Sequence, residues 1–261
     1  PARTLSLCEE YGVFLDFKLD NLQWQKQEVL ANKERKNRKP FAKAAFVNGD
    51  GMRRVYENLG CAVFSAAESL SDPSAEEFCN AVNILNAEKI VLLPNNKNAV
   101  MAAEQAKKLC DTQEREIIII PTENSVEGYF ALAMDIPDSL DTDRRIAGMQ
   151  QYKDGLTVVM QTVATKDCAF ADGACKKGDC ITLLDGKLFH AADDCVSCIV
   201  ETLEKCEDIE DKDSLALFVG KDMPEEQTER LTREIQCRFP LMEIETVSGG
   251  QTLYGYMLGL V

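Results

Sequence analysis

Residues 89–106 read K-I-V-L-L-P-N-N-K-N-A-V-M-A-A-E-Q-A and combine a short apolar run, a polar turn and the start of a helix. A continuous apolar run of this length is typical of a strand that is buried on both faces of a parallel sheet. The Ala-rich stretch that follows favours a helix, and Asn98 stands at its N-cap position. Residues 89–93 and 99–110 therefore predict one strand–helix unit.

The same alternation recurs on both sides of this unit. Further strands are expected at 42–47, 61–65 and 116–120, and further helices at 51–59, 74–86 and 125–134. Strands that alternate with helices through short loops favour right-handed crossovers. The first half of the chain is thus predicted to be α/β, an open parallel-sheet lobe of three layers.

The second half predicts a smaller mixed-sheet α/β lobe. After a strand at 157–165 comes a Gly- and Cys-rich turn region, and Asp185-Gly186 then marks a tight hairpin turn. Helices are expected at 194–205 and 225–239, and strands at 215–219, 242–247 and 253–260. We predict four segments: 1–39, which ends in a basic linker; a parallel lobe at 40–138; a linking helix at 139–152; and a mixed-sheet lobe at 153–261.

Composition excludes several classes of protein. The 261 residues have a net charge of −15, which repels phosphate backbones and anionic membranes. No apolar run approaches the ~20 residues that a membrane-spanning helix needs. An odd number of cysteines, 11 in a long chain, favours free thiols in the cytoplasm, and a single histidine excludes a His-rich metal site. Because the chain starts at Pro1 within structured sequence, we expect it to be part of a longer protein.

Polar residues follow three of the predicted parallel strands, at the edge where open α/β sheets bind ligands. Helix N-termini and a lysine at this edge suit a phosphate or carboxylate, whereas Asp50 and Glu123 oppose it. The same residue types are ordinary turn and cap residues, so a purely structural role is equally open. The candidate anion-binding residues are Asn48, Gly49, Gly51, Asn95, Asn96, Lys97, Asn98 and Thr122.

Cys195 and Cys198 have the C-x-x-C spacing of some metal and redox sites. The cysteines upstream have no matching spacing, and we expect Asp193 and Asp194 to raise the pKa of both thiols. We therefore expect packed free thiols and no metal site. His190 has no neighbouring motif, and no catalytic residue is assigned.

Several motifs together resemble the C-terminal region of fatty acid kinase A-like proteins. Residues 90–106 resemble the family's hallmark stretch L-P-N-N-K-N-x-x-x-A-A-E-Q-A, and V-N-G-D-G-M at 47–52 resembles its N-G-x-G loop. S-G-G-Q-T-L-Y at 248–254 resembles its terminal G-G-Q-P-x-Y, which adds Gly249, Gly250 and Gln251 to the candidates. Residues 1–39 resemble the tail of the family's middle domain followed by the basic linker.

The resemblance implies a DegV-like fold of two lobes and a non-catalytic module that docks an acyl-carrying DegV-like subunit. The intact protein would be an ATP-dependent kinase that phosphorylates fatty acids. It would bind ATP and magnesium on a separate N-terminal domain, so no cofactor is expected here. Its partners would be the acyl carrier and its own kinase and middle domains. One alternative is a module that binds a small anion or a fatty-acid carboxylate. A weaker one is a dihydroxyacetone-type kinase, whose substrate-binding His has no counterpart in the matching loops.

Overall fold

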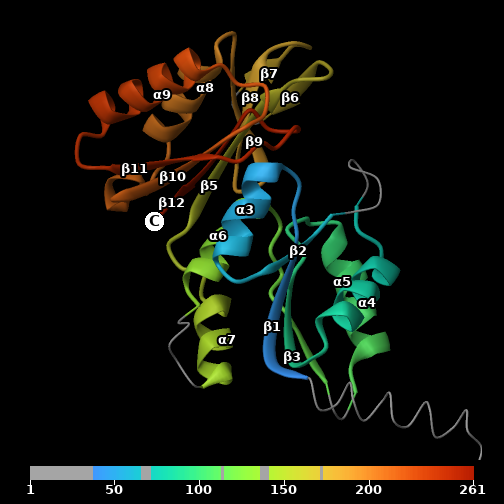
Figure 1. Cartoon of the computed structure of the whole chain (residues 1–261). Helices are drawn as coiled ribbons and strands as arrows, with labels where there is room; N and C mark the ends of the chain where they lie inside the picture. The colour runs from blue at the N-terminus through green and yellow to red at the C-terminus, as the bar shows by residue number, and fades with distance from the viewer. Residues whose placement is uncertain (1–37, 66–71, 113–114, 136–140, 171–172) are drawn as a thin grey trace, which may run out of the picture. The chain divides into compact units, whose positions relative to one another are not determined.

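The computed structural model describes residues 38–65, 72–112, 115–135, 141–170 and 173–261, and Lys39–Val261 form one compact unit (Figure 1). Four parallel strands form the first sheet, in the order β2–β1–β3–β4. These strands are β1 (Lys39–Phe46), β2 (Ala62–Phe64), β3 (Ala87–Leu93) and β4 (Glu116–Ile119). The intervening helices are α3 (Asp50–Asn58), α4 (Ala75–Leu85), α5 (Ala99–Cys110) and α6 (Ser125–Ala133), and α7 (Thr142–Gln150) follows them.

Side chains alternate between the two faces of this sheet, as the pleat of a strand requires. Ala44 of β1 and Ile90 of β3 pack against α4 and α5. Their neighbours Ala45 and Val91 pack on the other face, in the core shared with α3, α6 and α7. The expected parallel sheet with helices on both faces is confirmed (Figure 1).

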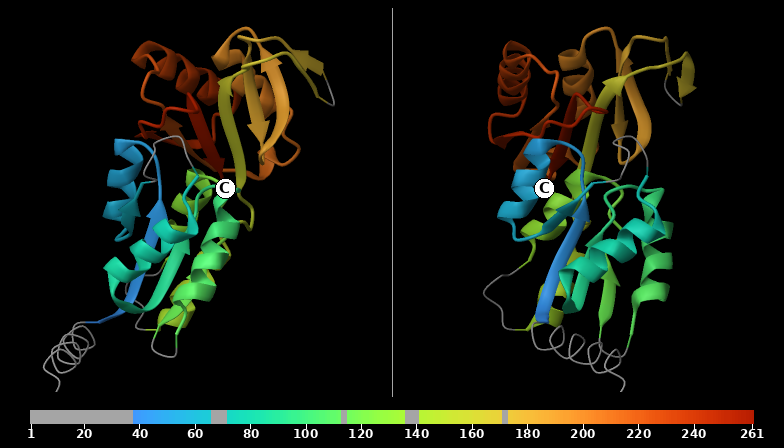
Figure 2. Two further views of the ribbon diagram at one scale, coloured as in Figure 1. Left: turned by 90° about the vertical axis from the view of Figure 1, so that its right-hand side faces the viewer. Right: turned by 45° about the vertical axis from the view of Figure 1, so that its right-hand side comes forward.

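A six-stranded mixed sheet forms the second lobe (Figure 2), and its strand order is β11–β10–β12–β5–β8–β9. Only β10 and β11 are parallel neighbours. The strands are β5 (Thr157–Val163), β8 (Cys180–Leu184), β9 (Lys187–Ala192), β10 (Ser214–Val219), β11 (Glu243–Ser248) and β12 (Tyr256–Leu260). The helical elements are α8 (Cys195–Glu204), the short 3-10 helix η1 (Ile209–Asp211) and α9 (Glu225–Arg238). A separate hairpin joins β6 (Cys168–Phe170) to β7 (Gly173–Cys175), where the sequence suggested only turns.

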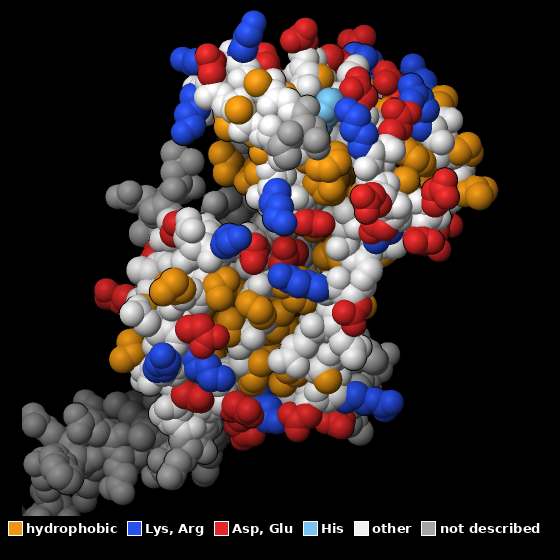
Figure 3. Space-filling view, turned by 180° about the vertical axis from the view of Figure 1, so that it is seen from behind, with side chains coloured by type: hydrophobic (Ala, Val, Ile, Leu, Met, Phe, Trp, Pro, Cys, Tyr) orange, Lys and Arg blue, Asp and Glu red, His pale blue; other side chains and the backbone are white. Residues whose placement is uncertain are grey.

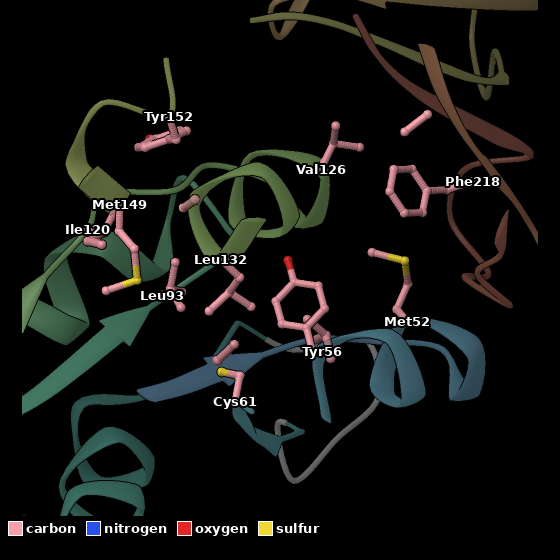
Figure 4. Packing of buried hydrophobic residues seen from close by; sticks show 14 of the residues in the cluster. Met52, Tyr56, Cys61, Leu93, Ile120, Val126, Leu132, Met149, Tyr152 and Phe218 are labelled. Carbon is pink, nitrogen blue, oxygen red and sulfur yellow. The ribbon is translucent and has the colours of Figure 1, made fainter. Parts of the chain in front are cut away.

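The second sheet also has two different faces. One face packs against α8 and α9, and buries Leu217 and Leu258 among their apolar side chains. The other face contributes Phe218 and Met257 to the core that contains α3, α6 and α7 of the first lobe. Figure 4 shows Met52 of α3 and Val126 of α6 beside Phe218. The two lobes therefore share one hydrophobic core.

The caps at the starts of α4 and α5 agree with the predicted helix boundaries. Ser74 and Glu77 form a reciprocal capping box at the start of α4. Asn98 occupies the N-cap position of α5 as expected, but its side chain makes no capping hydrogen bond. α7 lies within the segment 139–152 that was predicted as a linking helix, and residues 139–140 at the start of that segment lie outside the described residues, as do 1–37. Among the helices described, none has the length and apolarity needed to cross a membrane.

Candidate functional site

A cleft of about 490 Å³ opens at the carboxyl edge of the parallel sheet and is lined by both lobes. The first lobe contributes the loops that follow β1, β3 and β4, together with Asp72 and Pro73. The second lobe contributes Met160, Met257 and residues 251–254. The edge predicted to bind ligands is thus the floor of a cleft whose opposite wall comes from the second sheet.

The predicted candidates fall into three groups. Six of them line the cleft: Asn48, Asn95, Asn96, Lys97, Asn98 and Gln251. Thr122 is fully buried behind them, where its Oγ1 accepts a hydrogen bond of 3.0 Å from the backbone N–H of Asn95. Its contact supports the loop after β3 and leaves no exposed atom for a ligand.

The remaining candidates are glycines that pack the two lobes together. The backbone N–H of Met52 donates to the carbonyl oxygen of Gly249 over 2.8 Å. A Cβ atom on Gly51 would lie 1.6 Å from the carbonyl oxygen of Ser248, so no side chain fits there. Gly49 has a φ of +101° and faces Gly250 in the same contact. Gly49, Gly51, Gly249 and Gly250 are absent from the cleft lining and instead hold the N-G-D-G loop against the S-G-G-Q loop.

The charges of the cleft do not favour an anion. Among the described residues, its charged lining consists of the acids Asp72, Glu123, Glu127 and Asp185 and one cation, Lys97. These four carboxylates and one ammonium group sum to a net charge of −3. Lys97 is 79% exposed, and its Nζ lies 3.6 Å from a carboxylate oxygen of Glu123. A carboxylate or phosphate entering the cleft would therefore meet repulsion at short range.

Two buried amides shape the floor of the cleft. The backbone of Asn95 is left-handed, with a φ of +54°, and its Nδ2 donates to the Phe46 carbonyl and to the Tyr56 hydroxyl. Its Oδ1 receives no hydrogen bond from the part of the chain that the structure describes, and it lies against Gly128. Gln251 repeats the arrangement, because its Nε2 donates to the Phe218 carbonyl while its Oε1 lies against Gly249. Both amides thus fix the backbone of the cleft.

A carboxylate network that the sequence motifs did not reveal lies beside these amides. Glu127 of α6 is 9% exposed and accepts hydrogen bonds from the Tyr152 hydroxyl (3.0 Å) and from the backbone N–H of Glu123 (2.9 Å). Asn124 caps α6 through the Glu127 N–H and donates its own Nδ2 to the Glu127 carboxylate. Burial and the nearby Glu127 charge raise the pKa of Tyr152, so it remains a donor. The spacing N-x-x-E at 124–127 was the available signal.

The thiols do not pair as the C-x-x-C spacing suggested. Sγ of Cys195 lies 2.7 Å from Sγ of Cys180, whereas Cys198 donates to the Cys180 carbonyl. The expected rise in both pKa values is half wrong. The hydrogen bond from Cys180 lowers the pKa of Cys195 to about 7, although Asp194 opposes this. Burial raises the pKa of Cys198 to about 11.

Known proteins with similar sequences fit this architecture. A FakA-like family model, which describes the C-terminal region of fatty acid kinase A-like proteins, matches residues 42–260. Protein YloV of Bacillus subtilis is 26% identical over 268 residues, which cover 99% of this chain and 47% of YloV. An uncharacterised protein of Staphylococcus aureus strain USA300 is 25% identical over 267 residues, which cover 100% of this chain and 47% of that protein. The chain thus spans about half the length of these curated relatives.

Solved structures with the same fold belong to the DegV family. The DegV family protein Cg2579 of Corynebacterium glutamicum has a TM-score of 0.61 at 11% identity, covering 85% of this chain and 96% of its own. The fatty acid kinase B3 protein of Streptococcus pneumoniae, solved with linoleic acid, has a TM-score of 0.55 at 10% identity, covering 85% and 99%. The expected DegV-like fold is confirmed. By the family model that spans nearly all of its described residues, the chain belongs to the fatty acid kinase A-like (FakA-like) family, as a C-terminal region.

Proposed function

We propose that this chain is the non-catalytic module with which a fatty acid kinase A-like protein docks an acyl-carrying DegV-like subunit. The observation that carries the proposal is the charge of the interlobe cleft, whose lining holds four carboxylates and one lysine. This lining suits basic side chains on a protein surface and opposes a free fatty-acid carboxylate. Membership of the FakA-like family supports the proposal that the intact protein is a fatty acid kinase.

The charge argument separates this proposal from the alternative in which the module itself binds a small anion. A bound carboxylate needs a charge-assisted donor, and Lys97 is the one cation that the described residues contribute to the lining. Glu123 already neutralises that charge in part. The amide of Asn95 uses both of its donors on the Phe46 carbonyl and the Tyr56 hydroxyl, and the amide of Gln251 donates to the Phe218 carbonyl. We therefore assign the acyl chain to the partner protein.

In this proposal the module holds the acyl carrier close to the kinase domain of the intact protein. ATP and magnesium would bind to the kinase domain of the intact protein, and phosphoryl transfer to the acyl carboxylate would take place between the kinase and the acyl carrier. Holding two reactants in place can remove several kcal/mol, up to about 7–11 kcal/mol, from a barrier. A docking module of this kind would work in the cytoplasm without a cofactor of its own.

Two acidic regions could meet the partner, and their ion pairs differ. In the stretch 201–213, Glu201 contacts His190 and Lys205, and Asp208 contacts Lys212 at 2.9 Å. Arg238 also pairs with Glu204, so three of the seven acids in this stretch have ion-pair partners among the described residues. In the cleft, Lys97 pairs with Glu123 and Lys153 lies 3.8 Å from Glu127, and the four carboxylates line a concave edge that can enclose a basic side chain. The proposal therefore places docking at the cleft.

Charge reversal at one residue of each region tests the assignment. Glu123→Lys at the cleft should weaken binding of a fatty-acid-loaded DegV-like protein by about tenfold, because like charges would then face each other. Glu207→Lys is the matched control on the exposed 201–213 stretch and should change the affinity by less than about twofold. Isothermal titration calorimetry measures both. Equal affinities for both variants and the wild type would contradict docking at the cleft.

A further inference from the structure

The second lobe contains two cysteines, both outside the cleft lining, whose sulfur atoms lie close together. Cys180 is the first residue of β8, and Cys195 is the first residue of α8. The strand register pairs Cys180 with Ala192, three residues before Cys195, and this pairing brings the two side chains to the same end of the hairpin. Their Sγ atoms are 2.7 Å apart, about 0.7 Å more than the ~2.0 Å of an S–S bond.

The environment of Cys195 favours reactivity. Its side chain is half-buried and therefore reachable by a small molecule, and its place in the first turn of α8 favours the thiolate. The pKa of Cys195 is lowered to about 7, mainly by the hydrogen bond from Cys180 and also by one from Gln227. The hydrogen bond from Cys180 thus favours the thiolate form of Cys195. Cys180, whose pKa is raised, is the buried partner.

We infer that Cys180 and Cys195 are a peroxide-sensitive dithiol that closes to a reversible disulfide. The thiolate of Cys195 attacks a hydroperoxide, which gives a sulfenic acid and releases water from hydrogen peroxide or an alcohol from an organic hydroperoxide. The Cys180 sulfur then attacks the sulfenic sulfur, and the departing oxygen leaves as a second water molecule. Overall, two thiols and one hydroperoxide give one disulfide, one water and one further water or alcohol.

Two other features of the chain supply comparisons. Cys79 and Cys110 are also close, with Sγ atoms 2.8 Å apart, but burial and the Cys110 hydrogen bond raise the pKa of Cys79 to about 11. Cys198 lies one turn from Cys195, yet its sulfur is directed to the Cys180 carbonyl. Proximity alone therefore predicts two cross-links, whereas proximity with thiolate character selects Cys180 and Cys195. The cross-link that forms first during oxidation shows whether proximity alone or thiolate character decides the pairing.

The test oxidises the reduced full chain with one equivalent of hydrogen peroxide, alkylates the remaining thiols and maps the peptides without reduction. The expected result is a Cys180–Cys195 cross-link that forms before any other and disappears with dithiothreitol. Cys198→Ser should still form it. Cys180→Ser keeps a hydrogen-bond donor beside Cys195 and should instead leave a sulfenic acid on Cys195 that dimedone traps, with circular dichroism confirming that the variant folds.

A second readout is thermal unfolding of the oxidised and reduced wild type. The disulfide would join the start of β8 to the first turn of α8, so oxidation should raise the Tm and dithiothreitol should return it. The inference is overturned if both cysteines remain alkylatable after peroxide treatment. It is also overturned if the first cross-link is Cys79–Cys110 or Cys195–Cys198.

Discussion

Glycines without room for a side chain set the distance between the two lobes. Gly51 meets the Ser248 carbonyl, and Gly259 of β12 meets Phe130 and Val126 of α6. Within the first lobe, Gly128 leaves room for Asn95, whose buried Oδ1 lies 2.1 Å from where a Cβ would be. The N-G-D-G and S-G-G-Q motifs were recognisable in the sequence, but their meeting was not, because about 200 residues separate them. Glycine-rich loops of this kind occur both where a ligand binds and where two backbones pack closely, so the motif alone does not distinguish the two roles.

Gly51→Ala should destabilise the protein by about 3 kcal/mol or more, since the new methyl group would overlap backbone atoms that cannot move independently. Gly155→Asn is the control, because Gly155 has open space around it and asparagine tolerates its positive φ of +72°. Urea denaturation followed by circular dichroism measures both. Equal stability of the two variants would show that the loop contact is not needed.

A buried acid also links stability to pH. Burial tends to raise the pKa of Asp135, but hydrogen bonds from Arg145 and Lys43 outweigh this and lower it. The folded protein therefore releases this proton more readily than the unfolded chain, whose aspartates titrate near pH ~3.9. The resulting stabilisation is complete above that pH and is lost as the pH falls through the folded pKa.

Asp135→Asn should cost about 3–5 kcal/mol at pH 7, because the side chain of Lys43 is only 6% exposed and would lose its counter-charge. The variant should also lose less stability than the wild type on acidification from pH 5 to about pH 3. Asp154→Asn, at an exposed position, is the control and should behave like the wild type. Stability measured across this pH range would contradict the account if all three curves were parallel.

At the scale of elements, apolar periodicity predicted most helices and strands of the described residues. The predicted helix at 99–110 coincides with α5, because alanines at 99, 103 and 106 form its buried face. Strand order in the second sheet was not predictable. The last strand, β12, lies between β10 and β5. The neighbours of β12 are set by tertiary packing, in which Tyr256 and Leu258 pack against α8 and α9. The Glu127 network was not predictable either, because it depends on tertiary packing: Tyr152 follows α7 and lies 25 residues after Glu127 in the chain.

Helix caps give a matched comparison between two asparagines at this edge. Asn124→Ala should destabilise the protein by about 1–2 kcal/mol, because Asn124 caps α6 and also binds the Glu127 carboxylate. Asn98→Ala should cost about 0.5 kcal/mol or less, because Asn98 makes no capping bond and its contact to Asp72 is exposed. Thermal unfolding ranks the variants. A larger loss for Asn98→Ala would be incompatible with these cap assignments.

At the scale of the whole molecule, the shared core couples the two sheets. The rings of Phe218 of β10 and Tyr129 of α6 lie 5.2 Å apart between centroids. Figure 4 shows Phe218 near Met52 and Tyr56 of the same buried cluster, and Tyr129 packs against this cluster. The division into lobes at 40–138 and 153–261 therefore remains a proposal about sequence segments, while the core is common to both. Figure 3 shows acidic and basic side chains interspersed over one face of the molecule.

Phe218→Ala should destabilise both sheets together, by about 3–5 kcal/mol. Hydrogen exchange measured in β3 of the first sheet and in β10 of the second should accelerate by the same factor, because one cooperative transition exposes both. Leu231→Ala, in the separate core under α9, is the comparison and should accelerate β10 at least as much as β3. Unchanged exchange in β3 of the Phe218→Ala variant would show that the lobes unfold independently.

The measurement that tests the central claim most directly is titration of this chain with a DegV-like protein that holds a fatty acid, repeated from low to high salt. The account predicts a complex of one chain with one loaded carrier, an affinity that falls as salt screens the acidic cleft, and no fatty acid transferred to this chain. Mass spectrometry of the native complex reads the stoichiometry and the location of the lipid together. Fatty acid bound by this chain alone, or the absence of a complex at every salt concentration, would contradict the docking role.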